Sequence, residues 1–337
     1  MHVTRAVMEF AITLLLLAVV AALPLGLGND YWLGVIIVSM YFAMLASAWN
    51  LLAGYTGQFS LAPATFGMIG AYTTSLLAYH YGVPPLLGIP AAILAAGLIG
   101  LLLGRIVLRL SGPYLALTTL AFAEILRVVI GNSINVTRGD LGLSVPGLFD
   151  SRLAYYALFV GVLALIQIGL FFLLRAPGGL YLQAIRDDEI AAASRGVDVV
   201  FWKTASFALS SAASGLAGAL YAHFAQLISP ELGLISQTGL VISMVVIGGM
   251  GTFVGPVLGA FLVYVTSEYL RDFGGYQLIV FAALVILFGR FFREGLWGLA
   301  RRALLPGPAP AAPGPSVAAP TAPAATPGTR SSEPERL

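Results

Sequence analysis

Several residue types are missing or nearly missing from this sequence. Its 337 residues include no cysteine, three histidines and a single lysine, Lys203. Without cysteine the chain cannot form a disulfide or a thiolate metal site, and with so few histidines we expect no bound metal. The net charge is only +2 and no basic cluster alternates with aromatic residues, so we expect no nucleic-acid partner.

Charged residues of either sign are also scarce. They make up 9% of the chain, whereas hydrophobic residues make up 59%, and the mean hydropathy is +0.92. A soluble domain is usually about 45–50% apolar and about 25% charged. The composition therefore excludes a soluble globular protein and predicts an all-α, polytopic integral membrane protein surrounded by lipid.

Apolar stretches suited to membrane helices follow one another along most of the chain. A bilayer core needs about 20 residues of helix. Two of the stretches are short and are separated by GGMGTFVGP (residues 248–256), so we expect broken or re-entrant helices there and a total of eight to ten crossings. The ten stretches are residues 7–27, 31–53, 59–80, 86–107, 113–131, 153–174, 204–227, 236–249, 254–270 and 276–292.

The two ends of the chain have different compositions. The first apolar stretch is not followed by a small-x-small cleavage site, so we interpret it as a membrane helix and not as a secretory signal. Residues 305–337 are rich in Pro, Ala, Ser and Thr and have no apolar period, which predicts a disordered tail. We therefore expect a transmembrane domain over residues 1–304, followed by that tail.

Basic residues cluster after even-numbered spans. Cytoplasmic loops of membrane proteins carry an excess of Arg and Lys. We therefore predict that residues 175–203 and both termini are cytoplasmic. The basic residues are Arg105 and Arg109 after the fourth span, Arg175, Arg186, Arg195 and Lys203 after the sixth, and Arg290, Arg293, Arg301 and Arg302 after the last.

Residues 175–203, which we call the charged loop, contain eight charged residues although they lie between apolar spans. The composition of residues 180–195 is helical. Asp187, Asp188 and Glu189 are placed to open a helix and Arg195 to close it before Gly196, in agreement with the helix dipole and with a glycine C′ position. We expect a short helix exposed to water, which is a surface that a soluble partner can bind.

Glycine and proline cluster in two places. The first interruption, residues 50–72, contains Gly57, Gln58 and Ser60, and the second, residues 247–259, contains Gly249 and Gly251. Close packing of membrane helices explains such glycines as well. A broken helix, however, frees backbone groups, and these are tolerated only beside protein or a water-filled cavity. We therefore take these five residues as candidates for a transport pathway.

The fifth span carries weaker candidates. Thr118 and Thr119 precede Glu124 and Arg127, which are three residues apart and can pair on one helix face. A pathway lining explains them, and so does an intrahelical pair with a snorkelling arginine.

An intramembrane enzyme is the remaining alternative, since Ser210, Ser211 and Ser214 are followed by His223. Small residues for helix packing explain the same serines. We expect no enzyme.

Four ordered blocks resemble LivM-type permease subunits of branched-chain amino acid ABC importers. They read NLLAGYTGQFSLAPATFGMIGAY, GPYLALTTLAFAEILR, LYLQAIRDDEIAAASRGVDVVFWKTASFALSSAASGLAGALYA and ISMVVIGGMGTFVGPVLGA. The resemblance implies a pore subunit of the bacterial inner membrane, paired with a LivH-type permease. It also implies two cytoplasmic ATPases that bind and hydrolyse ATP, and an extracytoplasmic substrate-binding protein. Residues 186–196 would form the coupling helix that docks on an ATPase: Arg186, Asp187, Asp188, Glu189, Arg195 and Gly196.

One departure from this family leaves the substrate open. Where the family tends to have Thr-Gly-Gly-x-x-Gly, this chain has Arg138 in place of a glycine. Branched-chain, hydrophobic amino acids are the first expectation, and urea or short-chain amides, which related permeases carry, are the alternative. An autonomous secondary transporter is a further alternative, for which Glu124 is the clearest carboxylate within a span. Whether the permease pair is homodimeric or heterodimeric also stays open.

Overall fold

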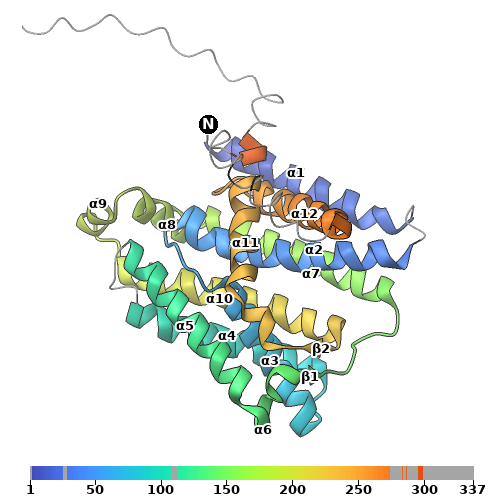
Figure 1. Cartoon of the computed structure of the whole chain (residues 1–337). Coiled ribbons are helices and arrows are strands. Elements are labelled where there is room, and N and C mark those ends of the chain that lie inside the picture. Colours follow the sequence, from blue (N-terminus) through green and yellow to red (C-terminus); the bar gives the residue numbers. More distant parts are fainter. Residues whose placement is uncertain are drawn as a thin grey trace, which may run out of the picture.

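The computed structural model describes residues 2–25, 29–107, 112–273, 283, 286 and 295–298, and these form a bundle of helices (Figure 1). The predicted tail lies outside the described residues. So does the predicted tenth span, residues 276–292, apart from two isolated positions. Arg109 and the basic residues that follow the tenth span are likewise outside the described part.

Nine helices within the described part occupy the first nine predicted spans. Four of them, counting α2 with the turn that continues it, are long and apolar enough to cross a membrane: residues 30–55, α4, α5 and α7. Two others, α11 and α12, are short, as the sequence predicted. The nine are α1 (His2–Ala22), α2 (Asp30–Asn50), α3 (Pro63–Tyr81), α4 (Pro85–Val107), α5 (Pro113–Asn132), α7 (Arg152–Arg175), α10 (Val199–Ala225), α11 (Ile235–Gly248) and α12 (Val254–Tyr269).

Helix α2 is the centre of the bundle. Its sequence is apolar all round, which is typical of a helix buried on every side. Met40, Met44 and Leu45 are completely buried, and α2 packs against α7, α10, α11 and α12. The other described spans are arranged around this helix, with α4 and α5 at the edge of the bundle (Figure 1).

Helix α10 packs against α3 and α4 through small residues. A Cβ atom on Gly218 would lie 1.8 Å from the carbonyl oxygen of Gly67, and one on Gly100 would lie 2.3 Å from Ser211 Oγ. Backbones this close require small residues, which is how membrane helices commonly associate. The run of small residues in α10 is therefore used for packing.

Both predicted interruptions are breaks in the helices. Helix α2 continues as a π-helix, η2 (Leu51–Tyr55), and the chain is then irregular up to α3. Between α11 and α12, residues 249–253 are likewise not helical. The irregular backbone covers only part of each predicted interruption, because residues 63–72 are helical in α3 and residues 254–259 are helical in α12.

The charged loop differs from the single helix that was predicted for residues 180–195. It contains two helices, α8 (Pro177–Asp187) and α9 (Glu189–Ser194), because Asp188 between them is extended. Its Oδ1 accepts hydrogen bonds from the backbone N–H groups of Ile190 and Ala191, which is N-cap geometry. The loop also ends earlier than predicted, since Asp198 caps α10 and Lys203 lies in the first turns of that helix.

Strands β1 (Leu143–Ser144) and β2 (Leu227–Ile228) and helix α6 (Ile134–Thr137) lie at the end of the bundle away from α8 and α9 (Figure 1). The two strands pair antiparallel, with Leu143 opposite Ile228. The remaining short elements are η1 (Leu23–Leu25), η3 (Gly139–Leu141), η4 (Pro230–Gly233) and η5 (Leu270–Phe273).

Candidate functional site

The two interruptions, far apart in the sequence, meet at the side chain of Asn50. The Nδ2 atom of Asn50 donates to the carbonyl oxygen of Thr252 at 2.9 Å, and its Oδ1 accepts from the backbone N–H of Gly251 at 2.8 Å. A Cβ on Gly54 would lie 2.7 Å from the Gly251 nitrogen. We call this contact the interruption junction (Asn50, Gly54, Gly251, Thr252). The two backbone segments approach this closely only because the glycines have no side chain.

Arg186 extends from α8 into the interruption junction. Its Nη1 donates to the carbonyl oxygen of Gly54 at 2.8 Å, and its Nε and Nη2 donate to Asp187 Oδ1 at 3.2 and 3.1 Å. A Cβ on Gly57 would lie 3.1 Å from Arg186 Cγ. Arg186 was predicted to belong to the coupling helix alone, yet it contacts the first interruption directly.

Two glycines at this place have backbone angles that other residues rarely adopt. The φ angle is +73° at Gly57 and +75° at Gly251. An L side chain in the left-handed region costs about 1–2 kcal/mol. At Gly251 a side chain would also be crowded, because its Cβ would lie 3.3 Å from the Gly54 carbonyl oxygen and 3.7 Å from Arg186 Nη1.

The other pathway candidates of the first interruption are packed inside the chain. The side chain of Gln58 is buried, and its Nε2 donates to Ser206 Oγ at 3.2 Å and to the Lys203 carbonyl oxygen at 3.3 Å. Ser60 is buried too, and its carbonyl oxygen accepts from Trp49 Nε1 at 2.7 Å. Gly57 is exposed and Gly249 is buried. That these residues line a pathway stays a prediction.

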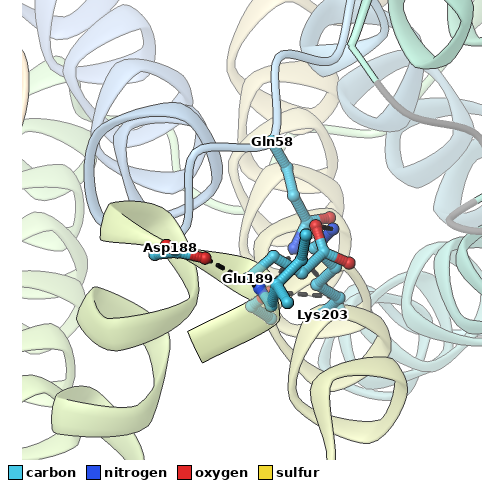
Figure 2. A network of polar contacts seen from close by, with 6 residues as sticks. Gln58, Asp188, Glu189 and Lys203 are labelled. Carbon is cyan, nitrogen blue, oxygen red and sulfur yellow. Dashed lines mark hydrogen bonds and ion pairs between the residues drawn. The ribbon is translucent and has the colours of Figure 1, made fainter. Parts of the chain in front are cut away.

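A polar network connects Gln58 to the charged loop (Figure 2). Lys203 forms an ion pair with Glu189 of α9, and the Lys203 backbone carbonyl accepts from Gln58. Figure 2 shows Gln58 extending from the first interruption toward Lys203 on α10, with Asp188 and Glu189 at the start of α9. The partly exposed ion pair contributes only about 0–1 kcal/mol to stability. Its importance is that it places α9 next to the residue of α10 that Gln58 contacts.

The end of α9 agrees with the sequence prediction. Arg195 is the C-cap residue and Gly196 follows with φ +86°. Asp187 has 69% of its side chain exposed, and Arg195 and Gly196 lie at the surface. The charged loop therefore presents carboxylates and arginines to solvent, and Arg186, 40% exposed, also bonds to the bundle at Gly54.

The two threonines of α5 have different surroundings. Thr119 is buried, donates to the Leu115 carbonyl oxygen at 3.0 Å and accepts from the backbone N–H of Leu61 at 2.9 Å. It thus ties α5 to the irregular segment before α3. Thr118 is half-buried and donates to the Tyr114 carbonyl oxygen at 2.8 Å.

The serines and the histidine of α10 do not form a catalytic arrangement. His223 Nδ1 lies 2.8 Å from the Pro146 carbonyl oxygen, which only accepts, so Nδ1 carries the proton and Nε2 accepts from Thr74 Oγ1 at 2.8 Å. Ser210 donates to the Ala48 carbonyl oxygen. Both ring nitrogens of His223 are therefore used for structure. Among the described residues, no group of three or more His, Asp or Glu side chains is placed to hold a metal.

Sequence reasoning missed Asn50. It was included as the first residue of the first interruption and was not singled out. The available signal was a lone amide at the end of an apolar span, immediately before the glycines. Its bonds to Gly251 and Thr252 connect residues about 200 positions away, which no local pattern reveals.

Comparison with known proteins agrees with the family resemblance of the four sequence blocks. Residues 31–289 match the family model described as the branched-chain amino acid transport system / permease component. The chain is 33% identical to the high-affinity branched-chain amino acid transport system permease protein LivM of Escherichia coli (strain K12), over 88% of this chain and 76% of that protein. It is 26% identical to the probable LivH permease of Methanocaldococcus jannaschii, over 75% of this chain and 86% of that protein.

No solved structure matches the chain. The family match covers most of the sequence, and the apolar helices suit a membrane protein. The chain therefore belongs to the family of permease components of branched-chain amino acid transport systems and is a multi-pass inner-membrane protein.

Proposed function

We propose that this chain is a transmembrane subunit of an ABC importer that translocates branched-chain, hydrophobic amino acids, while separate ATPase subunits supply the energy. The observation that carries the proposal is the contact of Arg186 with Gly54 at the interruption junction. It connects a water-exposed charged loop to the place where two broken helices meet. A subunit driven from outside needs such a connection.

The charged loop is the surface that we assign to the ATPases. Asp187, Asp188, Glu189 and Arg195 are exposed there, and charges on a rim are suited to electrostatic docking. If an ATPase moves α8, the Arg186 guanidinium moves relative to the Gly54 carbonyl oxygen. The junction would then loosen, and the helix ends on both sides of it would separate.

Opening of the junction would expose residues that are now packed. Gln58 and Ser60 are buried in the closed arrangement, and we propose that they face the pathway only after α2 and α12 move apart. The proposed pathway residues are Gly57, Gln58, Ser60, Thr118, Thr119, Gly249 and Gly251.

The orientation and the partners follow from the same proposal. The charged loop and both termini face the cytoplasm, where two ATPases bind. A LivH-type permease completes the pore, and an extracytoplasmic binding protein docks at the opposite end, near α6, η3 and η4. Co-reconstitution tests this: uptake of leucine should need ATP, the partner permease, the ATPases and the binding protein together. ATP-dependent uptake by the isolated chain would refute it.

The orientation has its own test. Since the chain has no cysteine, a single cysteine at Ser194 of α9 can be labelled on a silent background. An impermeant thiol reagent should label it in inverted vesicles and leave it unlabelled in intact cells. Labelling from outside intact cells would overturn the topology.

Urea or short amides remain the second candidate substrates, because of Arg138. The residue has φ +60°, and Gly139 beside it has φ +57°. Glycine adopts these angles without strain, which explains the two glycines that the family tends to carry there. Arg138 adopts the same positive φ angle, which is strained for a residue with a side chain, and it adds an exposed charge to the loop that we assign to the binding protein. Competition between leucine and urea for ATP-dependent uptake separates the two substrates.

A further inference from the structure

An ion pair lies on an exposed face of a membrane helix. Arg127 Nε donates to Glu124 Oε2 at 3.0 Å, and Arg127 Nη2 contacts the other carboxylate oxygen. The Glu124 side chain is 51% exposed and the Arg127 side chain is 27% exposed. Helix α5 is a candidate membrane span of 20 residues that is mostly unburied within this chain. Glu124 lies eight residues before its end, about 12 Å along the axis.

The neighbouring span provides a reference for a lipid-facing surface. Helix α4 has the same low burial, and its exposed residues at four-residue spacing are Leu94, Leu98, Leu102 and Ile106. At the same depth α5 exposes an ion pair, and the exposed side chains around it, Leu117, Ile125 and Val128, are apolar. A charged side chain facing hydrocarbon costs about 2.5–3.5 kcal/mol even on the mildest scales. The ion pair is therefore the feature that sets this face of α5 apart from that of α4.

We infer that the exposed face of α5 lines the substrate passage and that Glu124 and Arg127 bind the zwitterionic head group of an α-amino acid. This inference rests on the proposed function and names the substrate class of its pathway. Ala121, one helical turn before Glu124, is small and exposed and leaves space beside the pair.

The geometry of the pair explains the choice of ligand. The Arg127 fork is filled by the two oxygens of Glu124, which is how a guanidinium binds a carboxylate. An amino acid brings one carboxylate and one ammonium group. When its carboxylate takes the fork and its ammonium meets Glu124, every charge keeps an opposite partner. Urea is uncharged and cannot replace either residue of the Glu124–Arg127 ion pair, so we expect this site to bind urea more weakly.

Contacts outside the pair hold Arg127 in place. The turn η4 lies beside it, since a Cβ on Gly233 would be 3.8 Å from Arg127 Cγ. The arginine stem is thus braced by a loop at the end of the bundle away from α8. Glu124 has the larger exposed fraction and is the member free to swing toward a ligand.

Accessibility tests whether the face meets water. In the assembled complex with partner permease and ATPases, single cysteines replace Ala121 beside the pair and Leu98 on the exposed side of α4. A water-soluble methanethiosulfonate should modify Ala121→Cys and leave Leu98→Cys unmodified. Failure to modify Ala121→Cys, with labelling by a lipid-soluble maleimide or by no reagent, would mean a lipid-facing or dry surface and would overturn the inference.

Transport tests the ligand class. Glu124→Gln should lower leucine uptake roughly tenfold or more, since a hydrogen bond to a charged group is lost, whereas Glu124→Asp should retain more of it. The control is Glu268→Gln, because Glu268 forms another ion pair three residues from its arginine, Arg271. Its uptake should stay within about twofold of the wild type, because Glu268 lies outside the proposed passage and a glutamine there can still accept from the Tyr31 hydroxyl.

The outcomes separate the two proposals. A wild-type complex that takes up urea and no leucine refutes the proposed function. A wild-type complex that takes up leucine, with Glu124→Gln equal to Glu268→Gln, refutes the head-group site alone.

Discussion

The interruption junction and the Glu124–Arg127 pair of α5 are both polar sites in a hydrophobic bundle, yet their polar groups are satisfied in different ways. At the junction, Asn50 and Arg186 bond to backbone atoms of the same chain, and glycines bring the backbones into contact. On α5, Glu124 and Arg127 bond to each other and remain partly exposed. The first region is complete within one chain, whereas the second leaves a surface for something from outside.

This difference has a mechanical consequence. A contact made of three hydrogen bonds and closely approaching backbones has to be broken before anything passes through it. An exposed ion pair is available at once. The structure therefore combines a closed junction near the charged loop with an exposed ion pair on α5.

The largest effect is expected where the junction is tightest. Gly251→Ala should lower substrate uptake more than tenfold, because its Cβ would lie 3.3 Å from the Gly54 carbonyl oxygen and the left-handed backbone adds about 1–2 kcal/mol of strain. Gly82→Ala is the matched control, since Gly82 has φ +63° with nothing within 4 Å. Uptake assays on both variants, at equal membrane abundance, test whether Gly251→Ala loses more activity than Gly82→Ala. Equal activity would show that crowding at Gly251 is unimportant.

The next effect concerns the amide that joins the interruptions. Asn50→Ala leaves the part-buried Gly251 N–H and Thr252 carbonyl without their partner, at a cost of about 1 kcal/mol for each group. We expect a lower melting temperature of the purified complex and uptake reduced several-fold. Ser39→Ala in the same helix is the control, because its hydroxyl bonds only to the preceding helical turn. A melting temperature equal to that of the control would contradict the role of the junction.

A conservative substitution at Arg186 tests whether ATP hydrolysis can be separated from substrate uptake. Arg186→Lys keeps the charge but loses the fork that spans Gly54 and Asp187. We expect ATP hydrolysis by the complex to persist while uptake falls a few-fold, so that more ATP is used per molecule transported. Arg105→Lys, at an exposed position near the end of α4, should leave this ratio unchanged. An unaltered ratio in Arg186→Lys would remove Arg186 from the coupling route.

The smallest effect is expected at the surface of the charged loop. Asp188→Ala removes the N-cap of α9, worth about 1 kcal/mol, whereas Asp188→Asn preserves a cap. We expect faster proteolysis of the loop in Asp188→Ala and a modest fall in uptake. Limited digestion of the two variants side by side measures this. Identical digestion would mean that α9 is held by other contacts.

Sequence reasoning succeeded where the physical signal is local. Membrane spans are identified by runs of apolar residues, and the nine spans within the described part were predicted to within a few residues at most ends. The breaks near Gly57 and at Gly249–Gly251 were also predicted, because glycines cluster there with a proline close by in the sequence. The split of the charged helix at Asp188 was not, because an aspartate can either continue a helix or cap the next one.

The sequence by itself determined that this protein is a helical membrane bundle, where its helices break and which loop is charged, because hydrophobicity and backbone preference act between near neighbours. Only the tertiary structure decided that the two breaks touch, that Arg186 reaches Gly54 across 132 positions, and that Glu124 remains exposed. Those outcomes depend on how helices pack around α2. A contact between distant residues exists only once that packing brings them together.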